Sequence, residues 1–231
     1  METPAASLDT VRLLASLTPT DRAAIARQCR WRRYTADEQI IDQMSDTRDV
    51  CLIVEGRVQV VLYSMSGREI TFDDVEAGGH FGELAAIDGQ PRSASVIALT
   101  DTLVAFMSPR LFQDIVTNHP KIALNVMQRL AAIVRSNTGR IMDLSTLGAN
   151  NRVHAELLRL AKATLKADNT AEITPIPIHG DIASRVSTTR ETVARVLSDL
   201  TRQGIIEKRG HSLMVLDYER LEQMVDEVRG V

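Results

Sequence analysis

The segment spanning residues 120–147 constrains the fold more than any other, because it predicts one long uninterrupted helix. After Pro120 it contains no further proline and only one glycine, Gly139. Its seam positions recur at separations of 4, 3, 4, 4 and 3 residues, close to the repeat of a coiled coil: Val126, Leu130, Ile133, Asn137, Ile141 and Leu144. Such a helix extends roughly 40 Å, too far for one small domain to cover. We therefore expect residues 120–147 to pair with a second copy of the chain in a two-fold dimer. The alternative is a helix packed wholly within its own chain.

The residues before this helix show the shorter period of antiparallel strands. Runs rich in β-branched residues occupy residues 51–54, 58–63 and 70–72. Glycines divide them at intervals of 11 residues, at Gly56, Gly67 and Gly78. This spacing favours a compact β-barrel or sandwich across residues 32–107. Two short helices are predicted ahead of it, within residues 8–28, with Thr18 as the N-cap of the second.

A second constellation lies within residues 181–200, where two short apolar faces are separated by Ser187 and Thr188. This pattern predicts a helix, a tight turn and a second helix of the kind that enters a DNA major groove. Charged side chains that avoid the apolar stripe of the second helix have the chemistry to read base edges: Arg190, Glu191 and Arg195. Thr188 and Thr189, at the start of that helix, are candidates for phosphate contacts. The alternative is an ordinary charged surface.

The residues that follow favour the DNA interpretation. Residues 204–216 predict a β-hairpin directly after the second helix, which completes a winged helix-turn-helix, and residues 218–228 predict a closing amphipathic helix. Between the long helix and this motif we expect a polar hinge near residue 148, a helix over residues 152–165 and a polar loop over residues 166–174.

A third constellation could bind a small anion. Gly82 permits close backbone approach, a short helix starting at Glu83 directs free N–H groups outward, and Arg92 with the Ser93 hydroxyl can hold a phosphate. Glu83 would suit a sugar hydroxyl. The predicted ligand is a sugar phosphate.

The predicted fold class is α+β, in three parts. These are a jelly-roll-like β-roll for ligand binding over residues 1–119, the long dimerisation helix and hinge over residues 120–148, and a winged helix-turn-helix over residues 149–231.

The sequence resembles the catabolite activator (cyclic AMP receptor) proteins of bacteria. The resemblance spans nearly the whole chain, and two motifs carry it: Phe81-Gly82-Glu83-Leu84 with Arg92-Ser93-Ala94, and Ser187-Thr188-Thr189-Arg190-Glu191-Thr192-Val193-Ala194-Arg195. It implies a homodimeric regulator of transcription that binds cyclic nucleotide and double-stranded DNA, with RNA polymerase as a further partner.

The resemblance also implies roles for the site residues. Gly82 and Ser93 would meet the cyclic phosphate, Arg92 its charge and Glu83 the ribose 2′-hydroxyl, with Leu84 in the same motif. Arg190, Glu191 and Arg195 would read a TGTGA-like half-site, twice in a palindrome.

One departure from the family lies on the long helix. Its base-contacting threonine–serine pair is replaced here by Asn137 and Thr138. Because an amide can both donate and accept, we expect relaxed purine selectivity, with cyclic AMP and cyclic GMP both binding. The alternative is that Asn137 fixes the register of the dimer.

The remaining features exclude other classes. Two cysteines and five scattered histidines give no metal site, and no catalytic constellation surrounds the predicted pocket, so we expect neither a cofactor nor an enzyme. No apolar run is long enough to span a membrane, and the first ten residues lack the pattern of a signal peptide, which favours a cytoplasmic protein. The main rival is a regulator of the same fold that senses another small ligand.

The net charge of −3 argues against DNA binding only when it is averaged over the whole chain. Residues 151–216 carry 10 basic and 7 acidic side chains, a local net charge of +3. So modest a charge predicts weak non-specific affinity and a dependence on specific contacts.

Overall fold

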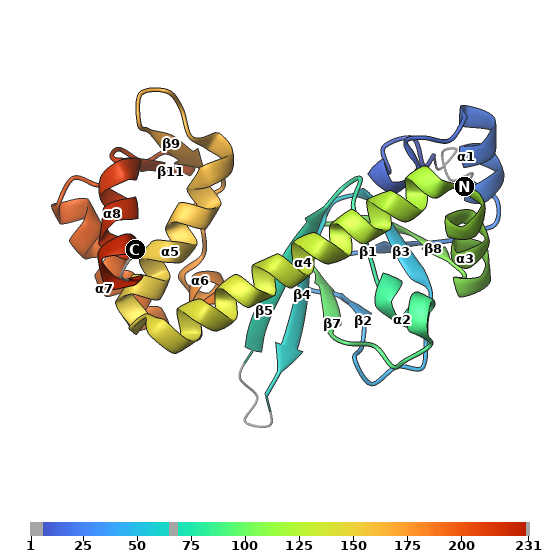
Figure 1. Cartoon of the computed structure of the whole chain (residues 1–231), viewed down its shortest axis with the longest axis horizontal. Helices are drawn as coiled ribbons and strands as arrows, with labels where there is room; N and C mark the ends of the chain where they lie inside the picture. The colour runs from blue at the N-terminus through green and yellow to red at the C-terminus, as the bar shows by residue number, and fades with distance from the viewer. Residues whose placement is uncertain (1–6, 65–68, 230–231) are drawn as a thin grey trace. The chain divides into compact units, whose positions relative to one another are not determined.

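The computed structural model describes residues 7–64 and 69–229 of the chain (Figure 1). They form two compact units that divide after Ile133, within the long helix α4 (Pro120–Thr146). The boundary predicted near residue 148 lies just after the end of that helix. Each unit has its own hydrophobic core.

The first unit opens with a short helical segment. It holds a single 3₁₀ turn, η1 (Arg12–Leu14), followed by α1 (Pro19–Ala26). The hydroxyl of Thr18 accepts the backbone N–H of Asp21 over 3.2 Å, so the predicted N-cap is confirmed.

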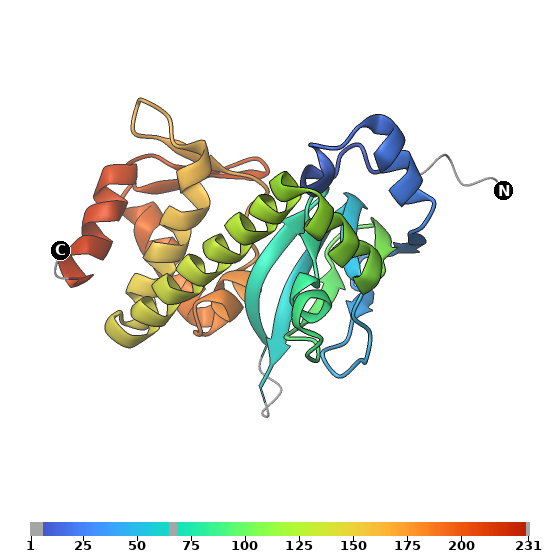
Figure 2. The same ribbon diagram turned by 45° about the vertical axis from the view of Figure 1, so that its right-hand side comes forward.

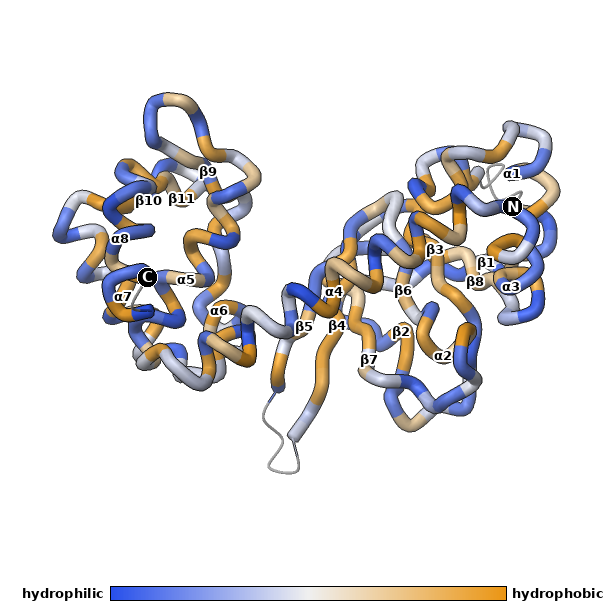
Figure 3. The backbone as a smooth tube through the Cα atoms, viewed as in Figure 1, coloured by the Kyte–Doolittle hydropathy of each residue, from blue (hydrophilic) through white to orange (hydrophobic). Residues whose placement is uncertain are grey.

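Two four-stranded antiparallel sheets follow and form the β-roll. One has the order β1-β8-β3-β6 and the other β2-β7-β4-β5. The strands are β1 (Arg30–Tyr34), β2 (Gln39–Ile41), β3 (Val50–Glu55), β4 (Arg57–Tyr63), β5 (Glu69–Glu76), β6 (His80–Phe81), β7 (Ser95–Ala98) and β8 (Thr102–Met107). Their inward side chains form one core cluster, which includes Ile53, Val58, Val75, Phe81 and Val104. Figure 3 shows the corresponding hydrophobic stretches along β3 and β4.

A second core cluster joins the roll to the surrounding helices. It includes Leu14 of η1, Phe112 of α3 (Pro109–Asn118), and Ile122 and Val126 of α4. The short helix α2 (Glu83–Asp88) lies beside α3 in two views (Figures 1 and 2). The Gln113 amide of α3 donates to the carbonyl oxygen of Ala86 over 2.7 Å, so α3 holds α2 in place.

Only part of the apolar seam predicted on α4 is exposed, because some of its residues pack within the first unit. Val126 is buried within the first unit, and Leu130 packs against the same core. The exposed apolar side chains include Met127, Val134 and Ile141, which are 58–64% exposed and lie seven residues apart. Met127 and Val134 each lie one residue beyond a predicted seam position, whereas Ile141 is itself a predicted seam position.

The second unit contains a helix-turn-helix and a three-stranded antiparallel sheet of order β10-β11-β9. Its elements are α5 (Ala149–Ala161), η2 (Lys162–Thr164), β9 (Ala171–Ile173), α6 (His179–Arg185), α7 (Arg190–Arg202), β10 (Ile206–Arg209), β11 (Ser212–Val215) and α8 (Tyr218–Arg229). Its core extends from Leu147 to Val225.

Two details of the sequence prediction were wrong in this unit. Helix α5 begins at Ala149, three residues earlier than predicted, so the hinge is shorter. The predicted polar loop contains β9, whose Ile173 lies opposite Leu213 of β11 and adds a third strand to the wing hairpin.

Candidate functional site

The first candidate site is centred on Gly82, where β6 ends and α2 begins. Gly82 has a φ of 82° and occupies the N-cap position of α2. A Cβ atom here would lie 2.7 Å from Nη1 of Arg92 and 3.0 Å from the carbonyl oxygen of Asp49. Both the backbone conformation and the space therefore require glycine.

Arg92 is 5% exposed, and the hydrogen bonds that position its guanidinium group go to uncharged acceptors. Its Nη1 donates to the carbonyl oxygen of Gly82 over 3.1 Å, and its Nη2 donates to the carbonyl oxygen of Asp49 over 3.0 Å and to Oγ1 of Thr47 over 3.2 Å. Burial lowers the pKa of Arg92. A buried cation whose hydrogen bonds go to uncharged acceptors is suited to receive an anionic ligand.

Glu83 is also buried, and one of its carboxyl oxygens lacks a hydrogen-bond donor. Its side chain is 5% exposed, and its Oε2 atom is buried without a hydrogen-bond partner. Burial raises the pKa of this carboxyl group. Hydroxyl donors of a ligand would satisfy Oε2 and favour the ionised form.

The predicted ligand-site residues fall into two groups. Gly82, Glu83, Leu84, Arg92 and Ser93 all lie on α2 or the loops flanking it in the first unit, with Leu84 and Ser93 exposed. Asn137 and Thr138 lie on α4 within the second unit. The hydroxyl of Thr138 donates to the carbonyl oxygen of Val134 over 3.0 Å, within its own helix.

Sequence reasoning missed Thr47 and Asp49, which position Arg92. Both belong to the loop between β2 and β3, more than forty residues away in sequence, and their pattern contains no signal for this contact.

The second candidate site is the helix pair α6 and α7. Ser187 in the turn between them has a φ of 53°, and the backbone N–H of Thr188 donates to the carbonyl oxygen of Ala183 over 3.0 Å. The turn therefore lies at the residues where the sequence predicts it. A Cβ atom at Gly180 of α6 would lie 3.0 Å from Nε of Arg190, so the Arg190 side chain lies directly against this glycine.

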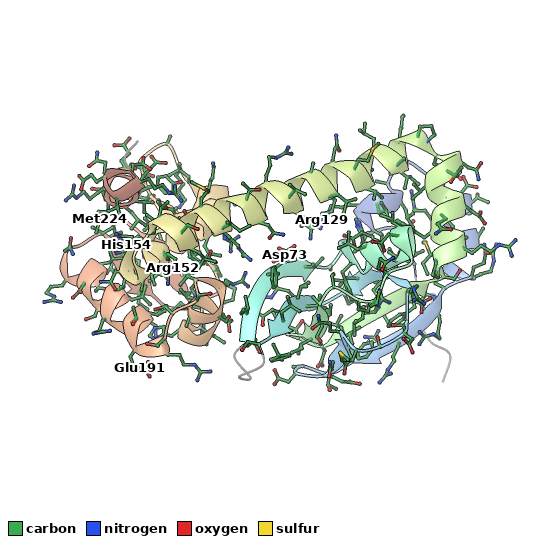
Figure 4. All side chains as sticks on the ribbon, turned by 60° about the horizontal axis from the view of Figure 1, so that its bottom comes forward. Asp73, Arg129, Arg152, His154, Glu191 and Met224 are labelled. Carbon is green, nitrogen blue, oxygen red and sulfur yellow. The ribbon has the colours of Figure 1, made fainter. Side chains whose placement is uncertain are left out.

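Helix α7 separates its buried and exposed residues as the sequence predicts. Val193, Val196 and Leu200 are buried in the core of the unit. Arg190, Glu191 and Arg195 are exposed, and Figure 4 shows the Glu191 side chain at the outer surface of the unit.

The first turn of α7 is already capped. Oγ1 of Thr189 accepts the backbone N–H of Thr192 over 3.3 Å. Hydrogen bonds from the Glu191 backbone and from Thr189 hold the pKa of Glu191 below its usual value. Thr189 therefore sets the start of the helix, and a phosphate that accepted its hydroxyl hydrogen would have to replace Glu191 as the acceptor.

The described residues lack the features of two other classes of protein. They contain no group of three or more His, Cys, Asp or Glu side chains arranged to hold a metal ion. They also contain no helix that is both long and apolar enough to cross a membrane.

Two family models match the chain. The cyclic nucleotide-binding domain matches residues 31–119, and the Crp-like helix-turn-helix domain matches residues 151–224. Together with the fold, they define a DNA-binding regulator with a nucleotide-binding domain. The chain belongs to the CRP family, whose members are transcription regulators rather than enzymes.

Curated relatives align over most of their length. The CRP-like cAMP-activated global transcriptional regulator of Mycobacterium tuberculosis is 26% identical over 204 residues, which cover 88% of this chain and 91% of the relative. The cAMP-activated global transcriptional regulator Vfr of Pseudomonas aeruginosa is 28% identical over 191 residues, which cover 81% of this chain and 89% of the relative.

Solved structures show the same fold. A CooA mutant from Carboxydothermus hydrogenoformans is 25% identical, with a TM-score of 0.80 and coverage of 97% of this chain and 100% of that one. A CRP-family transcriptional regulator from Thermus thermophilus is 28% identical, with a TM-score of 0.66 and coverage of 84% and 96%.

Proposed function

We propose that the protein is a homodimer that binds palindromic TGTGA-like DNA when a cyclic nucleotide, cyclic AMP or cyclic GMP, occupies the β-roll. The observation that carries this proposal is the pair of buried groups on α2 and its flanking loop. Arg92 is held by neutral acceptors, and Oε2 of Glu83 has no hydrogen bond. A cyclic sugar phosphate supplies both an anion for Arg92 and a hydroxyl donor for Glu83. Relatives named as cAMP-activated regulators support this choice of ligand.

In the proposed complex, the backbone at Gly82 and the hydroxyl of Ser93 bind the cyclic phosphate and Arg92 neutralises it. Glu83 accepts from the ribose 2′-hydroxyl, beside Leu84. Asn137 and Thr138 on α4 contact the purine, and the amide of Asn137 is compatible with either adenine or guanine.

The proposed dimer forms through α4. Met127, Val134 and Ile141 present apolar side chains at heptad spacing, which is the pattern of a helix that pairs with a second copy. Val134→Glu should dissociate the dimer in sedimentation measurements, whereas Ala132→Glu, at an exposed position of the same helix, should not.

DNA binding is assigned to α7. Arg190, Glu191 and Arg195 contact base edges, while Thr188 and Thr189 contact phosphates. Nucleotide binding shifts the population of dimers toward the arrangement in which both copies of α7 reach successive major grooves. The protein acts in the cytoplasm, with RNA polymerase as a further partner.

The experiment is a fluorescence-anisotropy titration of a palindromic TGTGA duplex with and without each cyclic nucleotide. The expected result is nucleotide-dependent binding that Arg92→Ala abolishes. Arg190→Ala should lose DNA binding and keep nucleotide binding. Loss of both activities in folded Arg190→Ala, or DNA binding indifferent to both nucleotides, would contradict the proposal. The second of these results would favour another ligand.

A further inference from the structure

The acidic side chain of Asp73, on β5, faces the interior of the β-roll. It lies opposite Val60 of β4, and Val75, two residues along the same strand, is 5% exposed in the core of the roll. Because alternate side chains of a strand share a face, Asp73 points to the same side as Val75. The β-bulge lies beyond this pair, where Val61 aligns with Thr71, so it does not alter the alternation. Carboxylates rarely face a core without a partner.

The partner of Asp73 is Arg129 of α4. The two side chains form an ion pair and point toward one another in Figure 4. Their side chains remain 40% and 34% exposed, respectively, so a ligand can reach both. The ion pair uses Oδ2 of Asp73 and Nη2 of Arg129. Oδ1 and the remaining guanidinium nitrogens are thus left for other bonds.

The ion pair and the proposed sugar site face the same core of the roll, because Val75, two residues from Asp73, and Phe81, two residues before Glu83, belong to one cluster. Burial is the main cause of the raised pKa of Glu83, and the charge of Asp73 adds to it, whereas Arg129 and Arg92 oppose it. Arg129 and Arg92 are therefore both within electrostatic reach of one carboxyl group. When a nucleotide has its phosphate on Arg92 and its ribose on Glu83, the base is the part left to meet the second arginine and its aspartate.

Guanine suits this pair of side chains better than adenine. Guanine presents two adjacent acceptors, O6 and N7, to which a guanidinium can donate bidentately. It also presents two adjacent donors, N1–H and the N2 amino group. One can donate to Oδ1 of Asp73 and the other to Oδ2, which can accept a second hydrogen bond beside that from Arg129. Adenine has only its N6 amino group as a donor on these edges, and its acceptors are isolated from one another.

We propose that Asp73 and Arg129 bind the base and make the site selective for guanine, so that cyclic GMP is the preferred ligand. This inference rests on the proposed function, because it requires a cyclic nucleotide on Arg92 and Glu83. It adds a discriminating contact from the roll itself, separate from Asn137.

The test is isothermal titration calorimetry of the full chain with cyclic GMP, cyclic AMP and cyclic IMP, which keeps O6, N7 and N1–H but lacks the N2 amino group. The wild-type protein should bind cyclic GMP at least about tenfold more tightly than cyclic AMP, with cyclic IMP between them. Asp73→Asn should remove the preference by weakening cyclic GMP alone. The matched control is Asp74→Asn, one residue along and on the opposite face of β5, which should keep the preference. Circular dichroism would verify that each variant is folded.

Equal affinities, tighter binding of cyclic AMP, or equal weakening of both nucleotides by Asp73→Asn would overturn the inference. Titration of Arg92→Ala distinguishes failure of this inference from failure of the proposed function. Arg92-dependent binding without base preference would refute only the guanine assignment. The absence of binding by either nucleotide would refute both.

Discussion

Nε of Arg152 donates to the backbone carbonyl oxygen of Val186 over 2.7 Å. The same guanidinium donates from Nη2 to the carbonyl oxygen of Ser187 over 3.1 Å and from Nη1 to that of Leu147 over 2.9 Å. One side chain of α5, labelled in Figure 4, therefore ties the turn of the helix-turn-helix to the residue that follows α4.

The first prediction concerns this contact. Arg152→Lys keeps the charge but replaces the planar fork with a single ammonium, which cannot reach three carbonyls in different directions. We expect a loss of about 2–4 kcal/mol in the free energy of unfolding, since bonds to charged donors contribute roughly 1.5–3 kcal/mol each. Urea denaturation measures this loss, and operator affinity should fall with it. Arg220→Lys, at an exposed position of α8, is the control. Unchanged stability in Arg152→Lys would show that the three bonds are dispensable.

The second prediction concerns the N-cap of α7. Thr189→Ala removes the hydroxyl that accepts the N–H of Thr192 and should cost about 1 kcal/mol of stability. Thr189→Ser retains the cap and should restore most of that stability in thermal denaturation. If serine proved as harmful as alanine, the methyl group rather than the cap would be responsible.

The third prediction concerns acid stability. Burial, reinforced by the charges of Arg129 and Arg12, lowers the pKa of His80 to about 4 from an ordinary value of 6.5. The unfolded chain therefore takes up a proton at a higher pH than the folded chain. The corresponding stability is present above pH 6.5 and is lost as the pH falls toward 4, by up to about 3 kcal/mol.

His80→Gln should flatten the dependence of unfolding free energy on pH between 6.5 and 4. His119→Gln, at an exposed position of the same unit, should retain the slope of the wild-type protein. An identical slope in the His80 variant would contradict the assignment.

The fourth prediction is that replacing Glu83 has opposite effects on the stability of the protein and on its affinity for cyclic nucleotide. Because its folded-state pKa is raised above 4.5, ionisation of Glu83 destabilises the ligand-free protein as the pH rises through that folded-state value. Glu83→Gln should therefore be more stable than the wild-type protein at neutral pH, with the difference vanishing below pH 4.5. The same variant should bind cyclic nucleotide roughly 10–100-fold more weakly. Parallel losses of stability and affinity would indicate a purely structural carboxyl group.

Local patterns in the sequence were sufficient to predict most of the fold. The helical period of residues 120–147 and the two apolar faces around Ser187 predict α4, α6 and α7 because each pattern involves neighbours in sequence. Strand β9 was missed because Ala171, Glu172 and Ile173 are too few to show alternation. They become a strand only by pairing with β11.

The candidate sites divide in the same way. Gly82 and Arg92 belong to one short motif that is visible in the sequence, and their roles in ligand binding remain predictions. The contacts of Arg92 with Asp49 and of Asp73 with Arg129 join residues 43 and 56 positions apart. No spacing rule relates such residues, since tertiary folding alone brings them together.

Leu147 bears on how the second unit can be studied as a fragment. It follows the last residue of α4, is 4% exposed in the core of that unit, and its carbonyl oxygen accepts from Arg152. An expression boundary placed at residue 149 would remove this side chain and leave a cavity, at a cost of about 2–5 kcal/mol. A fragment for spectroscopy should therefore begin at least one helical turn before Leu147, and a protease that cleaves just after it should yield a less stable product.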